Sequence, residues 1–387
     1  MTELYGALLL LVSCSMASAS ETIVLKASTV LPVTGPPLSP GYVVIEGDRI
    51  VAVGALAPED GDVSDLGEAW LTPGFIDAGW RAFGDRVNGS GASRPAWQWS
   101  DALDREQKPQ TAWEGGVTAA LAVPVAQEAI DGWAPLVRFA PEGLEIVRAR
   151  ALLIGSLVPA LERTSEMQSL LLDGARAQEA WSRYEEALSR FRQAEELGLA
   201  SEDPPRIPDA DPALAPLSMV LSGELPVRLR VEELAALNRL IEAEQLEGVR
   251  FWIAGEWSPP EAGNLRERVV VTLAPRTLQR LGTTKSSEAR DWLESEWTCV
   301  FASEELEDPG YLRFEAARAI AKGAAREDVL AALTLVPARE LGVADELGSL
   351  SPGCRADMVL WTGDPFDPRS RVSAVILAGQ LRKLGAN

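Results

Sequence analysis

Apolar and polar residues follow a strand-like pattern over the first part of the chain, from residue 22 to about residue 70. Residues 41–45 and 49–53 are rich in apolar, β-branched residues, and the Gly-containing turn 46–48 separates them. Two such runs joined by a short turn predict a β-hairpin, and residues 22–26 predict a further strand. No catalytic constellation lies in this segment.

From residue 71 onward, short apolar runs that indicate buried strands are interspersed with helix-forming segments. The first run follows the turn signal Pro73-Gly74. A chain of 387 residues is long enough for one large domain and a small one. The apolar runs cover residues 71–81, 117–123, 151–155, 225–231, 248–256, 268–275 and 298–304.

An amphipathic helix is predicted in the middle of the chain. Apolar residues recur there at steps of three and four between Ala177 and Leu197, which places them on one face of a helix. The opposite face carries arginines and glutamates and is expected to be solvated. The periodicity ends at Gly198, and the Pro-rich residues 202–216 predict a surface connection.

Two motifs resemble the signature sequences of the metal-dependent amidohydrolases. Residues 71–81 are similar to that family's Pro-Gly-x-Ile-Asp-x-His-x-His, at the end of the first barrel strand. Residues 333–361 are similar to its C-terminal pattern, Thr-x-x-Pro-Ala-x-x-Leu-Gly followed by Gly-x-(Leu/Ile)-x-x-Gly-x-x-Ala-Asp-(Leu/Met)-Val. The Gly-Val-Thr run at 116–118 and the helical segment resemble the imidazolonepropionase-like branch and its exported members.

This resemblance implies an α/β fold. A (β/α)8 TIM-type barrel is expected at about 71–335, with a helical insertion at about 161–216. Residues 20–70 and 336–387 are then the two halves of a small composite β-sandwich. The chemistry implied by the family is the hydrolysis of C–N bonds other than peptide bonds by a metal-bound water.

The complete absence of histidine changes what the resemblance implies for the site. The family's metal-binding and catalytic positions fall on Gly79, Arg81, Arg230, Gly255 and either Ser303 or Glu304. Glycine has no ligand atom, and arginine is permanently cationic and cannot coordinate a metal. We therefore expect no metal, no other cofactor and no catalytic residue. Arg81 is instead expected to pair with Asp77 or Glu304, and Arg230 with a carboxylate or carbonyl nearby.

The opposing interpretation is a metal site rebuilt from carboxylates. The available side chains are Asp77, Asp85, Glu256 and Glu304, an all-oxygen set that suits Ca²⁺ or Mg²⁺. The sequence favours an inactive, metal-free relative that binds a small molecule or serves as a scaffold for an active homologous subunit. The alternative is an active hydrolase with a remodelled metal site. The candidate pocket consists of Asp77, Arg81, Arg230, Glu256, Ser303 and Glu304.

The chain is strongly acidic, with a formal net charge of −21. Nucleic acids and anionic lipid surfaces are polyanions, so this charge argues against both as partners. The acidity is adequately explained by solubility.

Residues 1–19 are typical of a targeting segment. An apolar run at 7–12 is too short to span a bilayer, and small residues at 17–19 fit a cleavage site. The run ending at Cys14 resembles a bacterial lipobox, in which that cysteine becomes the lipid anchor. Either route predicts export to the periplasm or the outer membrane. Cys299 and Cys354 are expected to be free thiols, with Cys299 buried, although an oxidising compartment also permits a disulfide.

Overall fold

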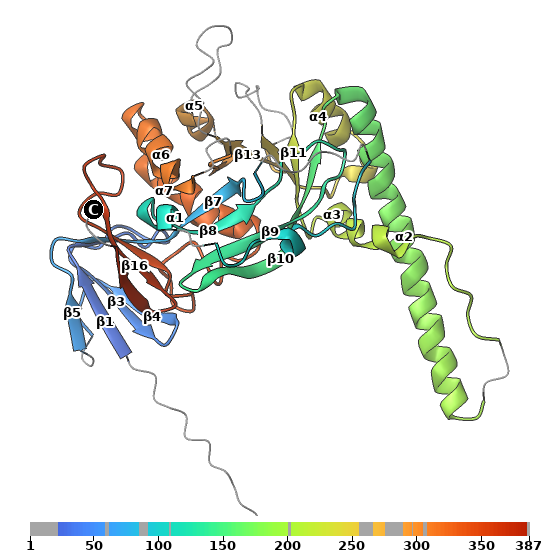
Figure 1. The fold of residues 1–387 in the computed structure, drawn as a ribbon, viewed down its shortest axis with the longest axis horizontal. Coiled ribbons are helices and arrows are strands. Elements are labelled where there is room, and N and C mark those ends of the chain that lie inside the picture. The colour runs from blue at the N-terminus through green and yellow to red at the C-terminus, as the bar shows by residue number, and fades with distance from the viewer. Residues whose placement is uncertain are drawn as a thin grey trace, which may run out of the picture.

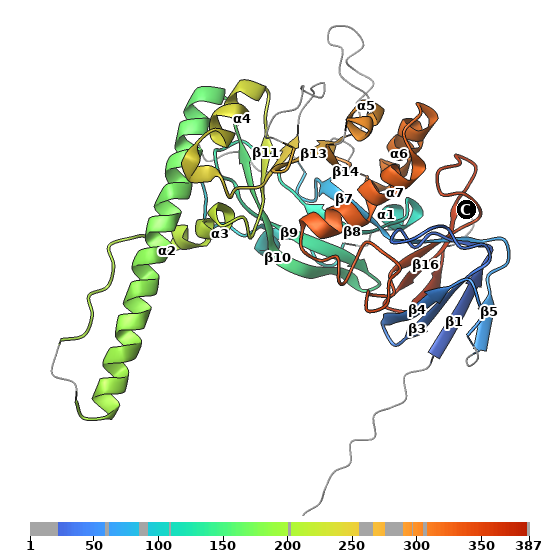
Figure 2. The same cartoon turned by 180° about the vertical axis from the view of Figure 1, so that it is seen from behind.

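The computed structural model describes residues 22–58, 62–84, 92–107, 110–199, 203–254, 266–274, 289–295, 297–304 and 308–384. This part of the chain forms an α/β barrel, with a small β-sandwich on one side and a long helix extending from the other (Figures 1 and 2). None of the described helices combines the length and apolar character needed to cross a membrane.

Segments from both ends of the chain form the sandwich, as predicted. One sheet has the strand order β4-β3-β1-β5, and the other has the order β17-β16-β15-β6-β2. Leu25 and Ile45 of the first sheet share a buried cluster with Leu71 and Ile376 of the second. The strands are β1 (Thr22–Ala27), β2 (Thr29–Val30), β3 (Gly41–Glu46), β4 (Arg49–Gly54), β5 (Asp62–Asp65), β6 (Trp70–Pro73), β15 (Met358–Trp361), β16 (Val372–Leu377) and β17 (Gln380–Lys383).

The barrel is an eight-stranded sheet in which the strands β7 to β14 follow one another in the order of the chain. Its two edge strands meet where the backbone N–H of Glu304 donates to the carbonyl oxygen of Gly79 at 2.9 Å. The expected barrel fold is therefore confirmed. Its strands are β7 (Phe75–Trp80), β8 (Val117–Ala122), β9 (Gly132–Ala140), β10 (Gly143–Ser156), β11 (Val227–Arg230), β12 (Phe251–Ala254), β13 (Val269–Leu273) and β14 (Thr298–Phe301).

One strand departs from the regular (β/α)8 pattern. Strand β9 runs antiparallel to both β8 and β10, whereas the other barrel pairs are parallel. Only residues 141 and 142 separate β9 from β10. A connection this short can form a hairpin but not the crossover that parallel neighbours require.

The helices lie outside the barrel sheet (Figures 1 and 2). Helix α2 (Ala160–Glu196) confirms a helix in the predicted region, but it starts well before the predicted apolar stripe. The last residue of that stripe, Leu197, follows the helix and is 66% exposed. Met167, Leu171 and Ala177 in its first half are buried. Farther along, Trp181 Nε1 donates to the carbonyl oxygen of Ala210 at 2.8 Å, so the returning chain partly covers the stripe. The other α-helices are α1 (Gln110–Glu114), α3 (Ser218–Leu221), α4 (Leu234–Ile241), α5 (Ala289–Glu294), α6 (Leu312–Ala321), α7 (Arg326–Leu333) and α8 (Leu335–Glu340).

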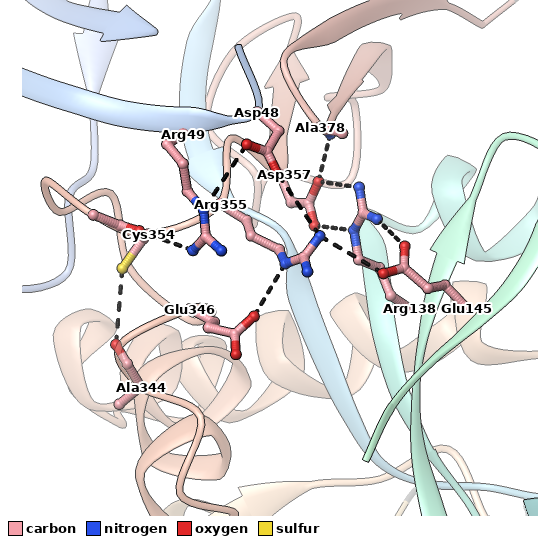
Figure 3. Close-up of polar contacts among 11 residues, drawn as sticks. Asp48, Arg49, Arg138, Glu145, Ala344, Glu346, Cys354, Arg355, Asp357 and Ala378 are labelled. Atoms are coloured by element: carbon pink, nitrogen blue, oxygen red, sulfur yellow. Dashed lines mark hydrogen bonds and ion pairs between the residues drawn. The ribbon is translucent and has the colours of Figure 1, made fainter. Parts of the chain in front are cut away.

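Asp357, in the C-terminal motif, ties the sandwich to the barrel (Figure 3). Its carboxylate accepts hydrogen bonds from Nε and Nη2 of Arg138 on β9 and from the backbone N–H of Ala378 at 2.8 Å. Both charged side chains are only 3% exposed. Glu145, on the neighbouring strand β10, also pairs with Arg138 but is 43% exposed. The motif aspartate therefore has a structural role at the junction.

Cys299 and Cys354 are buried free thiols, as expected. Burial raises the pKa of Cys299 well above its usual range. Since the thiolate is the reactive form, Cys299 is not a nucleophile in the folded protein.

Candidate functional site at the barrel mouth

Asp77 joins the two edge strands of the barrel at the carboxyl end of the sheet. Its Oδ1 accepts hydrogen bonds from the backbone N–H groups of Gly79 at 3.0 Å and of Ser303 at 2.9 Å. Its Oδ2 accepts a third hydrogen bond from the Ser303 hydroxyl at 2.5 Å. Asp77 and Ser303 are both completely buried. The side chain of Asp77 thus closes the barrel and has no lone pair directed to bulk solvent.

Burial raises the pKa of Asp77 to about 6, against the lowering effect of its three hydrogen bonds; the nearby Glu304 carboxylate adds to the rise. The ordinary value is 3.8, so the folded protein holds this proton more tightly than the unfolded chain. The stabilisation linked to this proton is fully present below about pH 4 and is lost as the pH rises through about 6.

Replacing Asp77 with asparagine is expected to remove this pH dependence. The asparagine Oδ1 can accept both backbone hydrogen bonds, and its Nδ2 can donate to the Ser303 hydroxyl. Urea unfolding across this pH range should give curves that converge near pH 4, with the variant more stable above pH 6 by on the order of 3 kcal/mol. Parallel pH profiles for the two proteins would contradict the raised pKa.

Gly79 is the residue that the sequence motif aligns with the first of the two histidines of the amidohydrolase signature. A Cβ atom built on Gly79 would lie 3.0 Å from Nη2 of Arg228 and 3.0 Å from Cβ of Ala302. Both separations are tighter than ordinary van der Waals contact. A side chain at position 79 would therefore require Arg228 or Ala302 to shift by a few tenths of an ångström, so the Arg228 guanidinium packs closely against this position.

The Arg228 guanidinium forms an ion pair with Glu304, through Nη2 and Oε1. Arg228 is 6% exposed and Glu304 is 18% exposed. Glu304 has a positive φ of 37°, a conformation that is uncommon for a residue with a side chain. The charged pair therefore stands at the mouth between strand β11 and the end of strand β14.

The structure brings Asp77, Gly79, Ser303 and Glu304 together, but it does not confirm the predicted pair of Arg81. Glu304 pairs with Arg228 and not with Arg81. Within the described part of the chain, Arg81 makes no ion pair with either Glu304 or Asp77. The prediction for Arg81 is therefore wrong.

Arg230 does have a carboxylate partner, but not in a buried site. It pairs with Glu232 at 3.0 Å, and the two side chains are 50% and 60% exposed. Because Arg230 is the last residue of β11, its side chain lies where the sheet ends and water begins. Gly255, Glu256 and Asp85 lie outside the described residues, as does Cys14.

Arg228 was missed because the motif places the family's ligand at Arg230. The signal that could have found it is the two-residue period of a strand, which puts both arginines on one face. Of the two, Arg228 lies two residues deeper in the strand, and it is the one that the barrel encloses.

The described residues do not fit the metal that the fold implies. Asp77 is hydrogen-bonded to Ser303 and Gly79, and Glu304 is paired with Arg228. No group of three or more cysteine and carboxylate side chains suited to a metal ion occurs among the residues placed by the structure. A guanidinium also carries positive charge and no lone pair for a cation.

Comparisons with known proteins agree with the architecture. Residues 310–382 match the family model described as the amidohydrolase family. A comparison with curated proteins found no match. An amidohydrolase from Thermotoga maritima MSB8 superposes with a TM-score of 0.69 and 22% identity, covering 93% of this chain and 99% of its own.

Two zinc-containing structures are also similar. An adenosine deaminase from Xanthomonas campestris with bound zinc has a TM-score of 0.52 and 15% identity, and covers 94% of this chain and 93% of its own. A mutant atrazine chlorohydrolase from Arthrobacter aurescens TC1, complexed with zinc and atraton, has the same TM-score and identity and covers 94% and 97%. At these identities the similarity shows a shared fold.

Proposed function

We propose that this protein, which has the amidohydrolase fold and the family's sequence pattern in its C-terminal segment, is a metal-free relative. It binds a small ligand at the barrel mouth and does not hydrolyse C–N bonds. The observation that carries this proposal is the Arg228 guanidinium, which lies against Gly79 and pairs with Glu304. A permanent cation stands here beside a position where the family has a metal-binding imidazole.

The charge balance supports the same proposal. A metal dication in such a barrel needs neutral imidazoles and carboxylates at the strand ends. The chain has no histidine, and the nearby carboxylates are engaged by Arg228, Ser303 and backbone N–H groups. We therefore do not infer a zinc site in this chain, although two similar structures contain zinc.

The proposal is tested by a hydrolase screen on cyclic amides and N-acyl or dipeptide-like substrates, with and without added Zn²⁺ and Mn²⁺. We expect no turnover above buffer in either condition. Metal-dependent turnover that is abolished by Glu304→Gln would overturn the proposal and establish the alternative, a hydrolase with a rebuilt carboxylate site. An inactive protein that co-purifies with an active homologue and binds no ligand would favour a scaffold role instead.

We also propose that the protein is exported, on the basis of residues 1–19. Mass spectrometry of the protein from its native host is expected to show a chain that starts after residue 19, or a diacylglycerol on Cys14. An intact Met1 in the mature chain would contradict export.

A further inference from the structure

Three buried hydrogen-bond donors near the mouth have no partner among the described residues. They are Nε of Arg228, Nε1 of Trp252 and Oγ1 of Thr272. Their side chains are 6%, 0% and 3% exposed, respectively. A buried polar group without a hydrogen bond costs roughly 1–3 kcal/mol, so three of them in one region point to a missing acceptor.

Strand register places the three side chains on the same inner face. Arg228 on β11 is paired with Trp252 on β12, and Trp252 is paired with Val270 on β13. Thr272 lies two residues after Val270, so it faces the same side one layer nearer the mouth. Trp252 and Val270 belong to the buried cluster inside the barrel. The three donors thus come from three consecutive strands and face one interior.

In strand register, Thr272 on β13 lies between Ala254 on β12 and Val300 on β14. Ala302 and Gly79 lie at the ends of β14 and β7. Ala302 packs in the same interior cluster as Trp252. Of the long side chains at this level, Arg228 lies against Gly79 and pairs with Glu304, and the half-exposed Arg230 pairs with Glu232.

The chemistry of the donors defines the ligand atom. The indole N–H of Trp252 and the Nε–H of Arg228 can only donate, and the Thr272 hydroxyl can donate as well. Glu304 engages Nη2 of Arg228 and leaves Nε unused. Because Glu304 already balances the charge of Arg228, the site offers donors without an excess of positive charge.

We propose that this interior face binds the carbonyl oxygen of a small uncharged organic molecule, held by Arg228, Trp252 and Thr272. The inference rests on the proposed function, because it takes the mouth to be a binding site with no metal. A carboxylate is disfavoured, since Glu304 and the buried Asp77 would repel it.

The test is a titration of the ¹⁵N-labelled full chain, followed by the indole N–H signals in NMR spectra. The signal of Trp252 is identified by its loss in Trp252→Phe. With N,N-dimethylacetamide, which accepts hydrogen bonds and cannot donate them, we expect this signal to move downfield and to saturate. Thr272→Val, which keeps the shape of the side chain, is expected to weaken binding several-fold, and Arg228→Met to abolish it.

Trp297 supplies a matched control. Its Nε1 is also buried without a partner, but it precedes β14, at the end of the barrel opposite the mouth. Trp297→Phe should leave the titration unchanged. A saturable shift with acetate in place of the amide would overturn the proposed ligand class. No shift of Trp252 in a folded protein would mean that water satisfies these donors, and would overturn the site.

The two proposals fail in distinguishable ways. Turnover in the hydrolase screen would refute the metal-free function, whatever the titration shows. An inactive protein without a Trp252 shift would refute only this carbonyl site.

Discussion

Replacing Asp357 with alanine is expected to lower the free energy of unfolding by about 3–5 kcal/mol. The substitution removes the carboxylate that accepts two hydrogen bonds from the guanidinium of Arg138, a side chain that is 3% exposed. It also removes the acceptor for the Ala378 N–H. The remaining partner, Glu145, is 43% exposed and pairs through a different nitrogen of Arg138 (Figure 3).

Urea unfolding measures this effect, and two control variants calibrate it. Glu145→Ala removes the exposed partner of the same arginine and should cost clearly less. Glu179→Ala breaks the exposed pair with Arg183 on helix α2, where the side chains are 63% and 74% exposed, and should cost about 0–1 kcal/mol. A loss for Asp357→Ala no larger than that of these controls would contradict the assigned role at the junction.

The second large effect is expected at the mouth, where removing one charge should destabilise the protein more than removing both. Glu304→Ala leaves the Arg228 guanidinium buried without an ion-pair partner. Glu304 is 18% exposed, so water reaches this end of the pair, and we expect a loss of about 2–4 kcal/mol. The double variant Arg228→Met/Glu304→Ala removes the uncompensated charge and should recover a substantial part of that loss.

Arg230→Ala is the matched control, since Arg230 lies two residues along the same strand. Its pair with Glu232 is about half exposed, so the expected cost is about 0–1 kcal/mol. The outcome that contradicts this assignment is a larger loss for Arg230→Ala than for Glu304→Ala.

The main architecture could be predicted because its signals are local. The apolar run after Pro73-Gly74 locates strand β7, Phe75–Trp80. The expected start of the barrel at residue 71 is too early, because residues 70–73 form strand β6 of the sandwich and pair with β15. The pattern around Asp357 places strand β15, Met358–Trp361, in the sandwich. In both cases a short apolar run follows Pro and Gly residues, and its type does not depend on distant contacts.

Strand β9 is a part of the barrel that such local signals did not predict. Its residues, Gly132–Ala140, are not among the apolar runs from which the sequence predicted barrel strands, and their direction could not be read from an apolar run in any case. Direction follows from the connection, and residues 141–142 permit only a hairpin with β10. The barrel resemblance favoured a regular alternation of strands and helices and hid this difference.

The site was predicted in part for a related reason. Asp77 and Glu304 lie near one another, as the motif predicts, because Asp77 is in the edge strand β7 and Glu304 follows β14, the edge strand that meets it. It cannot choose between Arg228 and Arg230, since both face the same side of a strand and differ only in depth. Depth depends on where the strand ends and on what closes the barrel above it, which are properties of the folded chain.

The most direct test of the central claim, that an arginine occupies the metal position, is the metal content of the purified protein. The full chain is incubated with Zn²⁺ and Mn²⁺, dialysed and analysed by inductively coupled plasma mass spectrometry. We expect far less than one ion per chain, both before and after incubation. One tightly held ion per chain, lost on Asp77→Asn or Glu304→Gln, would contradict the account.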